Sequence, residues 1–188
     1  FFGQLYTKDK KIFFNRYKNH INNICDILRN IGVNINTVPV LDIRRKKSHN
    51  IIGSRSFSEN STVVSNLGRL CVGFYNKNKI GTVIKHMPGL GLSKCDSHYM
   101  TPIINASKKE LIKRDFKPFK VCKSLFAMTA HAVYPKYDSH YTATHSKIII
   151  NEIIRNHMNF KGLLISDDIS MKSLKYSLEE NALKAIHA

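Results

Sequence analysis

The chain alternates apolar, β-branched runs with amphipathic segments, and no other feature of the sequence limits the fold as strongly. The apolar runs are typical of buried strands, and they span residues 33–43, 81–84, 124–131 and 161–166. Apolar residues recur at helical spacing in segments 10–29, 61–75, 107–119, 146–158 and 172–188. Strands that alternate with helices form right-handed βαβ units and a parallel sheet. We therefore predict an α/β fold with a single domain over residues 1–188.

Polar, titratable residues follow each of the four candidate strands. They are Asp42, then Lys85 and His86, then His131, and finally Asp167 and Asp168. Catalytic residues at the carboxyl ends of parallel strands are typical of a (β/α)8 TIM barrel, so this placement favours a barrel over a layered sheet. A complete barrel needs about 250 residues. The sequence therefore predicts a partial barrel.

Composition limits the partners that this chain is expected to have. Its formal charge is +17, but the cations are dispersed, apart from short runs such as residues 44–47, and no nucleic-acid-binding motif accompanies them. A solvated basic surface is therefore favoured over a nucleic-acid site. No apolar run reaches the roughly 20 residues of a membrane span. The four cysteines lie too far apart for a metal or redox motif, so reduced thiols in a cytoplasmic protein are expected.

Several blocks of residues occur in an order that resembles a known family. They are Gly32 to Asp42, Ile52 to Glu59, Lys85 to Gly89, Asp96 to His98, Met128 to Pro135, and Phe160 to Asp168 with Met171 and Lys172. Together they resemble glycoside hydrolase family 3 and, within it, the NagZ-type bacterial β-N-acetylhexosaminidases. The resemblance implies barrel units three to six of eight, preceded by the helix of unit two. It also implies a fragment that lacks both ends of the family's barrel.

The resemblance assigns the catalytic nucleophile to Asp167. Retaining glycosidases attack the anomeric carbon with a carboxylate, and a second group protonates the leaving oxygen. Neighbouring residues of a strand point to opposite faces, so one of Asp167 and Asp168 should face the sugar. Asp167 is favoured for that position. Asp168 is then expected to have a structural role, such as capping the next helix.

The resemblance assigns the acid/base to a pair on a loop, His98 with Asp96. In an extended loop residues two apart lie on one side, so Asp96 could accept the ring N–H of His98 and fix its tautomer. A neighbouring carboxylate also favours the imidazolium form, which can donate a proton near neutral pH. An isolated Asp-x-His is more typical of an ordinary surface loop, and the family context is what favours catalysis here.

Lys85, His86 and Arg55 resemble the residues that bind the hydroxyl groups of the N-acetylglucosamine ring. The alternatives are an ion pair between Lys85 and Asp42, and a solvated loop charge for Arg55. The sequence leaves the role of His131 open. The chain also departs from the family, which commonly has His and a polar or acidic residue where this loop has Leu90 and Leu92.

The function implied by the resemblance is a retaining β-N-acetylglucosaminidase. Its expected substrates are GlcNAc-containing muropeptides of peptidoglycan recycling or chito-oligosaccharides, with no metal and no other cofactor. The expected protein is cytoplasmic, free of nucleic-acid and membrane partners, and monomeric when full length. Two alternatives stay open: an inactive truncated fragment of such an enzyme, and a basic nucleic-acid-binding module.

Overall fold

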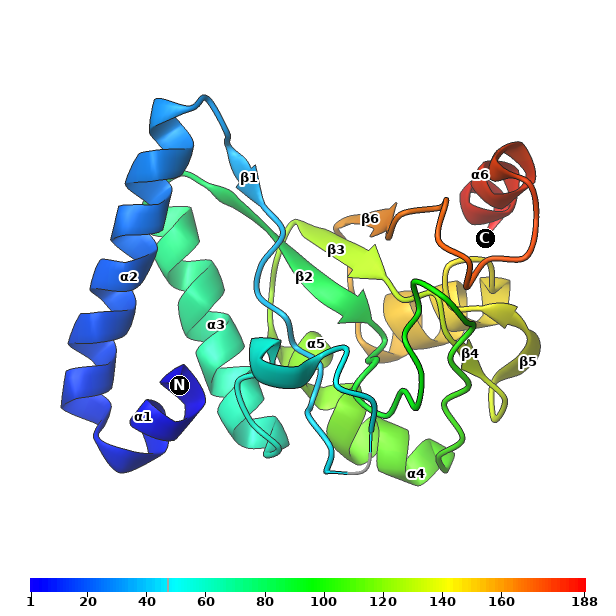
Figure 1. Ribbon diagram of the computed structural model, residues 1–188, viewed down its shortest axis with the longest axis horizontal. Helices are drawn as coiled ribbons and strands as arrows, with labels where there is room; N and C mark the ends of the chain where they lie inside the picture. Colours follow the sequence, from blue (N-terminus) through cyan, green and yellow to red (C-terminus); the bar gives the residue numbers. More distant parts are fainter. Residues whose placement is uncertain (47) are drawn as a thin grey trace.

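The computed structural model describes residues 1–46 and 48–188, and its centre is a four-stranded parallel sheet (Figure 1). The sheet order is β1-β2-β3-β6, and its strands are β1 (Ile35–Asn36), β2 (Gly81–Met87), β3 (Phe126–Thr129) and β6 (Leu163–Ser166). Neighbouring strands in this order pair in parallel, so the predicted α/β fold is confirmed. Lys47, the last residue of the basic run at 44–47, lies outside the described residues.

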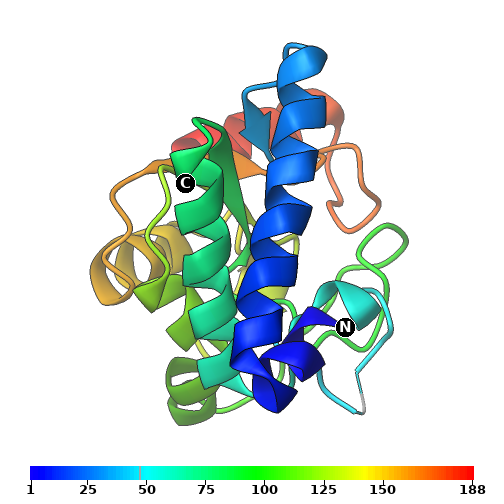
Figure 2. The same ribbon diagram turned by 90° about the vertical axis from the view of Figure 1, so that its left-hand side faces the viewer.

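Two long helices cover one side of the sheet, where Figure 2 shows them next to each other. They are α2 (Lys10–Asn30) and α3 (Ser61–Lys77), and the short helix α1 (Phe2–Lys8) precedes them. The side chains of Asp9 and Asn60 accept hydrogen bonds from first-turn amides and cap α2 and α3. Both helices begin and end close to their predicted limits. A core that includes Phe13 and Tyr17 joins α1, α2 and α3.

The first predicted strand is much shorter than its apolar run. The run at 33–43 pairs as a strand only over Ile35–Asn36, because Pro39 has no N–H to donate to the ladder. The backbone still follows β2 beyond this point, since the Leu41 amide donates to the Lys85 carbonyl at 2.8 Å. Asp42 is therefore delivered beside the end of β2, although the regular ladder has already stopped before Pro39.

The predicted helix at 107–119 is also wrong as a single element. It is divided into α4 (Lys108–Glu110), the π-helical turn η2 (Leu111–Asp115) and α5 (Lys117–Val121). Pro118 lies in the first turn of α5, where a residue without an N–H is tolerated, so it begins a helix rather than ending one. The last helix, α6 (Leu178–His187), begins later than predicted, at a Ser177 cap.

A hairpin that the sequence analysis did not predict follows β3. Its strands are β4 (Val133–Tyr134) and β5 (Asp138–Thr142), which pair antiparallel. The Tyr134 hydroxyl donates to the Gly89 carbonyl at 2.8 Å and so ties the hairpin to the loop after β2. The π-helical segment η3 (Ile149–His157) then leads to β6.

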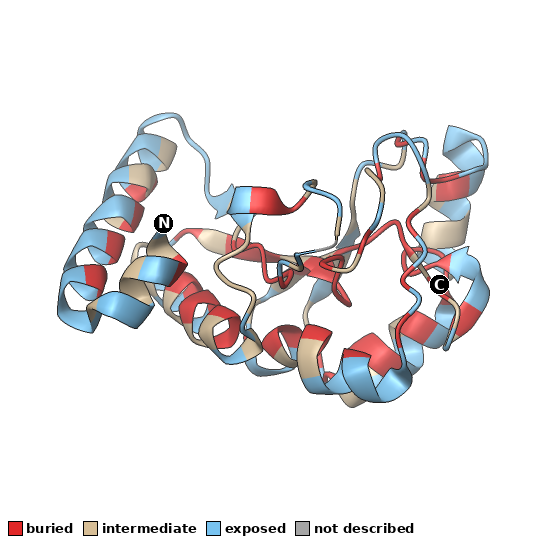
Figure 3. Cartoon of the chain, turned by 60° about the horizontal axis from the view of Figure 1, so that its bottom comes forward, coloured by how far each residue is buried: buried red, intermediate tan, exposed pale blue. Residues whose placement is uncertain are grey.

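The main core lies between the sheet and the helices that pack on it, and Figure 3 shows buried residues concentrated on these facing surfaces. It includes Leu41, Ile84, Ala127 and Ile154, all fully buried. The carboxyl ends of β2, β3 and β6 point toward the same side of the molecule (Figure 1). Among the described residues, none of the helices is long and apolar enough to cross a membrane.

Candidate active site

A buried carboxylate–imidazole pair lies at the end of β2. Asp42 is fully buried, and its Oδ2 accepts from the His86 backbone N–H at 3.2 Å and lies 2.6 Å from Nδ1 of the His86 ring. Its other oxygen, Oδ1, accepts from the Leu90 amide at 2.6 Å. Because an ionised carboxylate only accepts hydrogen bonds, Nδ1 of His86 carries the proton. Asp42 thus fixes both the orientation and the tautomer of His86.

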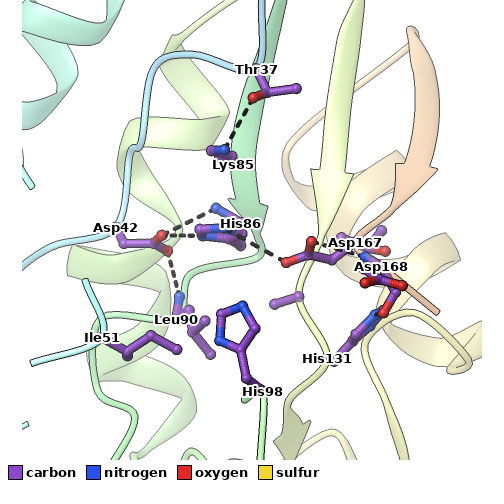
Figure 4. A network of polar contacts seen from close by, with 12 residues as sticks. Thr37, Asp42, Ile51, Lys85, His86, Leu90, His98, His131, Asp167 and Asp168 are labelled. Carbon is purple, nitrogen blue, oxygen red and sulfur yellow. Dashed lines mark hydrogen bonds and ion pairs between the residues drawn. The ribbon is translucent and has the colours of Figure 1, made fainter. Parts of the chain in front are cut away.

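The other ring nitrogen of His86 faces Asp167. His86 Nε2 lies 3.8 Å from Oδ2 of Asp167, which follows β6 directly (Figure 4). The Asp167 side chain keeps 25% of its surface exposed, so a bound molecule can reach it. Its Oδ1 accepts from the Asp168 amide at 2.9 Å. The structure thus arranges Asp42, His86 and Asp167 in one row, from the core to an accessible carboxylate.

Asp168 points away from this row and stabilises a turn. Its Oδ1 accepts from both the amide and the hydroxyl of Ser170, at 2.8 and 2.7 Å. These bonds, above all that from the hydroxyl, hold the pKa of Asp168 below its usual value. The expected helix cap by Asp168 is wrong, because Ser177 caps α6 instead.

Asp96 and His98 form a pair on the loop after β2. Asp96 Oδ1 accepts from the His98 backbone N–H at 2.8 Å and lies 2.7 Å from Nδ1 of the ring. The hydrogen bond from the backbone N–H is the main reason why the pKa of Asp96 is lowered. The His98 side chain is 63% exposed, and Figure 4 shows its ring pointing into the space beside His86 and Asp167.

The start of this loop is fixed by close packing. Gly89 has φ +137°, a backbone conformation that favours glycine, and a Cβ on Gly91 would lie 2.0 Å from the Ile43 carbonyl oxygen. Leu90 is buried, and its amide binds Asp42. The apolar residue at position 90 therefore packs into the core, while the loop still presents Asp96 and His98 to solvent.

Lys85 and Arg55 lie together but apart from the Asp42 carboxylate. Lys85 donates to the Thr37 hydroxyl at 3.3 Å, while Asp42 pairs with His86 instead. Burial, and then the nearby Arg55 guanidinium, lower the pKa of Lys85. The Arg55 guanidinium donates to the Ile51 carbonyl at 2.7 Å. Both cations line one cavity of about 450 Å³.

Two residues of this region were not assigned a site role from the sequence. Asp42 was recognised only as a polar strand-end residue, and its bond to His86 spans 44 positions of sequence, which no local pattern reveals. Thr144, which contacts the buried His131 ring, lies after the unpredicted hairpin. Within the described part of the chain, no group of three or more His, Cys, Asp or Glu residues is arranged to hold a metal ion.

The arrangement supplies two kinds of chemistry within one site. An accessible carboxylate, held by a backbone amide and faced by an imidazole, is suited to attack an electrophilic carbon. An exposed imidazole with a carboxylate on its other nitrogen is suited to move a proton. Two neighbouring cations can bind polar oxygens of a ligand.

Comparisons with known proteins agree on one family. The model of the glycosyl hydrolase family 3 N-terminal domain matches residues 17–188. A β-hexosaminidase of Actinobacillus pleuropneumoniae serotype 3 is 32% identical over 164 residues, which cover 84% of this chain and 47% of the relative. Another β-hexosaminidase, from Haemophilus influenzae, is also 32% identical, with 84% and 46% covered.

Solved structures show the same similarity. NagZ from Neisseria gonorrhoeae, in complex with N-trifluoroacetyl-D-glucosamine, aligns with a TM-score of 0.89 and 29% identity, covering 99% of this chain and 55% of that one. CbsA from Thermotoga neapolitana aligns with a TM-score of 0.80 and 36% identity, with 90% and 38% covered. The chain spans about half the length of the A. pleuropneumoniae and H. influenzae relatives.

Proposed function

The chain belongs to glycosyl hydrolase family 3, with an α/β fold of the TIM-barrel type, and on this premise we propose that the protein hydrolyses terminal β-linked N-acetylhexosamine with retention. One observation carries the proposal. The accessible carboxylate of Asp167 lies 3.8 Å from the ring of His86, which is itself held by the buried Asp42. The names of the β-hexosaminidase relatives point to the same reaction.

Asp167 is the proposed nucleophile. Its carboxylate attacks the anomeric carbon and forms a glycosyl ester, while the leaving oxygen departs with a proton. The Asp168 amide holds the attacking group in place before the sugar binds, and the ring of His86 faces it at 3.8 Å. Such preorganisation lowers the barrier because little reorientation is left for the transition state.

His98 is the proposed acid and then base. With Nδ1 bound to Asp96, its free Nε2 is the atom that gives a proton to the leaving oxygen and later takes one from water. The Asp96 carboxylate accepts from Nδ1–H and so fixes the ring tautomer and orientation. An exposed loop suits this role, because the same group must serve both the departing sugar and the incoming water.

Lys85, Arg55 and His86 are the proposed sugar-binding residues. Lys85 and Arg55 line one cavity, and the Asp167 carboxylate partly offsets the lowering of the Lys85 pKa by burial and Arg55, which supports a shared role. Cationic N–H groups bind hydroxyl oxygens in fixed directions. We propose no metal and no other cofactor for this chemistry, because the carboxylate and imidazole supply both catalytic steps.

The finer assignments are also proposals. They are N-acetylglucosamine as the sugar, muropeptides of peptidoglycan recycling or chito-oligosaccharides as substrates, and a cytoplasmic, monomeric full-length protein without nucleic-acid or membrane partners. The likeness to NagZ with bound N-trifluoroacetyl-D-glucosamine supports the sugar. The dispersed positive charge gives no comparable support for a nucleic-acid site.

The test is hydrolysis of an aryl β-N-acetylglucosaminide by the protein produced from its complete coding sequence. We expect release of the phenol and, by NMR, a β-configured sugar as the first product. The matched aryl β-glucoside, which lacks the acetamido group, is the control substrate and should react far more slowly. Inverted configuration, or equal rates on the two glycosides, would contradict the proposal.

A further inference from the structure

The His131 imidazole is buried between the turn that follows the hairpin, which carries Thr144, and the loop that carries Asp167. Its exposed fraction is 1%, and both ring nitrogens have partners. Nδ1 lies 2.7 Å from the Thr144 hydroxyl, and Nε2 lies 3.0 Å from the Asp168 carbonyl oxygen. The ring therefore joins two segments that are 24 residues apart, counting from Thr144 to Asp168.

The two partners determine which nitrogen carries the proton. A carbonyl oxygen only accepts, so His131 Nε2 carries the hydrogen and donates it to Asp168. Burial lowers the pKa of His131 and favours the neutral ring, so Nδ1 accepts from the Thr144 hydroxyl. Thr144 Oγ1 can in turn accept from the Thr129 hydroxyl, which lies 2.9 Å away in β3.

The residue whose carbonyl His131 binds, Asp168, directly follows the candidate nucleophile. Asp168 accepts from His131 through its carbonyl and donates through its amide to Asp167 Oδ1 at 2.9 Å. Figure 4 shows His131 beneath the Asp167–Asp168 pair, on the side away from Asp42. A shift of the Asp168 backbone would therefore move the hydrogen bond that orients the Asp167 carboxylate.

We propose that His131 and Thr144 are positioning residues: they hold the Asp168 carbonyl and so fix the backbone of Asp168, whose own N–H, in the preceding peptide group, aims the Asp167 carboxylate at the anomeric carbon. This inference rests on the proposed function, because it assumes that Asp167 is the nucleophile. It gives a role in turnover to a buried histidine that otherwise resembles an ordinary packing residue.

The chain offers a matched control in His145. This histidine is 6% exposed, its Nε2 lies 3.1 Å from the Asn181 carbonyl, and burial lowers its pKa as well. It thus has similar burial and a similar bond to a backbone carbonyl, but its carbonyl partner lies in α6, and the Asn181 side chain bonds to the Ile169 and Tyr176 carbonyls rather than to Asp167 or Asp168. Equivalent substitutions at positions 131 and 145 therefore separate lost stability from lost positioning.

The experiment measures kcat and KM for an aryl β-N-acetylglucosaminide, with the protein from its complete coding sequence and its His131→Met, His131→Gln and His145→Met variants. Thermal unfolding of each variant gives the folded fraction. We expect His131→Met to lower kcat by about 10²-fold with little change in KM, because misplaced catalytic groups lose rate rather than binding. His131→Gln should recover about tenfold of that loss, since its amide nitrogen can replace Nε2. His145→Met should leave kcat per folded molecule unchanged.

Thr144 provides the second pair of variants. Thr144→Ser keeps the hydroxyl and should retain kcat within about twofold, whereas the similarly shaped Thr144→Val should lower it by roughly tenfold. Equal kcat values for His131→Met and His145→Met, or a change in KM alone, would overturn the positioning role while wild-type hydrolysis still supports the proposed function. An inactive wild type would instead reject the proposed function, and this inference with it.

Discussion

The nucleophile side of the candidate site rests on side chains that are almost completely buried, whereas its acid side stands on an exposed loop. The side chains of Asp42 and His86 are 0% and 6% exposed, but that of His98 is 63% exposed. Asp42 contacts His86 and Leu90, so it joins the end of the first strand to β2 and to the following loop. The Asp96 side chain, in contrast, binds the backbone N–H and the ring of His98, two positions away on the same loop.

This difference follows from what each side must do. A nucleophile gains rate from a fixed direction of attack, and hydrogen bonds across buried strands provide that direction. An acid/base must serve a leaving group and then water, and a local pair on an accessible loop fixes the tautomer while leaving the imidazole open to both. Substitutions on the two sides should therefore differ in stability, in rate and in dependence on substrate.

The largest effect is expected for Asp167→Ala. Removal of the nucleophile should lower kcat by at least about 10⁴-fold on every substrate, because both chemical steps pass through the glycosyl ester. Asp168→Asn is the neighbouring control, and it should keep most activity, since the hydrogen bonds of the Asp168 side chain to described residues are both with Ser170. If Asp168→Asn were as inactive as Asp167→Ala, the assignment of the two carboxylates would be wrong.

His98→Ala should distinguish substrates, unlike Asp167→Ala. Loss of a general acid costs roughly 10²–10⁴-fold when the leaving group needs a proton, and much less when it does not. For the natural disaccharide we expect the glycosylation rate to fall by this full factor. For a dinitrophenyl glycoside, whose leaving group needs no proton, we expect a clearly smaller fall. Steady-state kcat/KM for the two substrates gives the comparison. An equal loss on both would contradict the role of His98 as the acid.

The fold and the two sides of the site differ in how far the sequence predicts them. Helices α2 and α3 were predicted almost completely, because their apolar periodicity lies within each helix and their capping residues directly precede it. The Asp96–His98 pair was also predictable, since its hydrogen bonds span two residues. The dependence of His86 on Asp42 was not, because it arises only when two parallel strands pair.

The elements that were missed have causes of the same kind. The first strand is shorter than its apolar run because Pro39 has no N–H to donate to the ladder. The segment 107–119 is divided into three short elements, and Pro118 lies in the first turn of the last one. The hairpin β4–β5 has only a two-residue first strand, too short for a periodic signal. The turn after this hairpin carries Thr144, so the contact between Thr144 and His131 could not be predicted from the sequence.

A third prediction concerns Asp42 and tests whether its buried hydrogen bonds contribute to stability and to kcat. Asp42→Asn should lower the free energy of unfolding by about 2–3 kcal/mol, since it weakens buried hydrogen bonds to a charged group. It should also reduce kcat by roughly 10–100-fold through the loss of His86 orientation. Urea unfolding and steady-state kinetics measure both. Asp96→Asn, the loop counterpart, should change stability by less than about 0.5 kcal/mol.

The smallest effect concerns pH. Burial lowers the pKa of His131 below its usual 6.5. As the pH falls, His131 is therefore protonated at a higher pH in the unfolded chain than in the folded protein. The His131 contribution to stability should therefore be complete above pH 6.5 and decline below it. Urea unfolding of wild type and His131→Gln at pH 7.5 and 5.5 tests this, and the variant should lose less stability on acidification. If wild type and His131→Gln lost the same stability between pH 7.5 and 5.5, His131 would not be buried in its neutral form.

The most direct measurement is mass spectrometry of the covalent intermediate. In the His98→Ala variant of the protein from its complete coding sequence, a dinitrophenyl β-N-acetylglucosaminide should still form the glycosyl ester, but no base remains to activate water. Acid quenching, proteolysis and peptide sequencing locate the sugar. The account predicts an N-acetylglucosaminyl ester on Asp167. An ester on Asp168, or continued turnover with an inverted product and no ester, would contradict it.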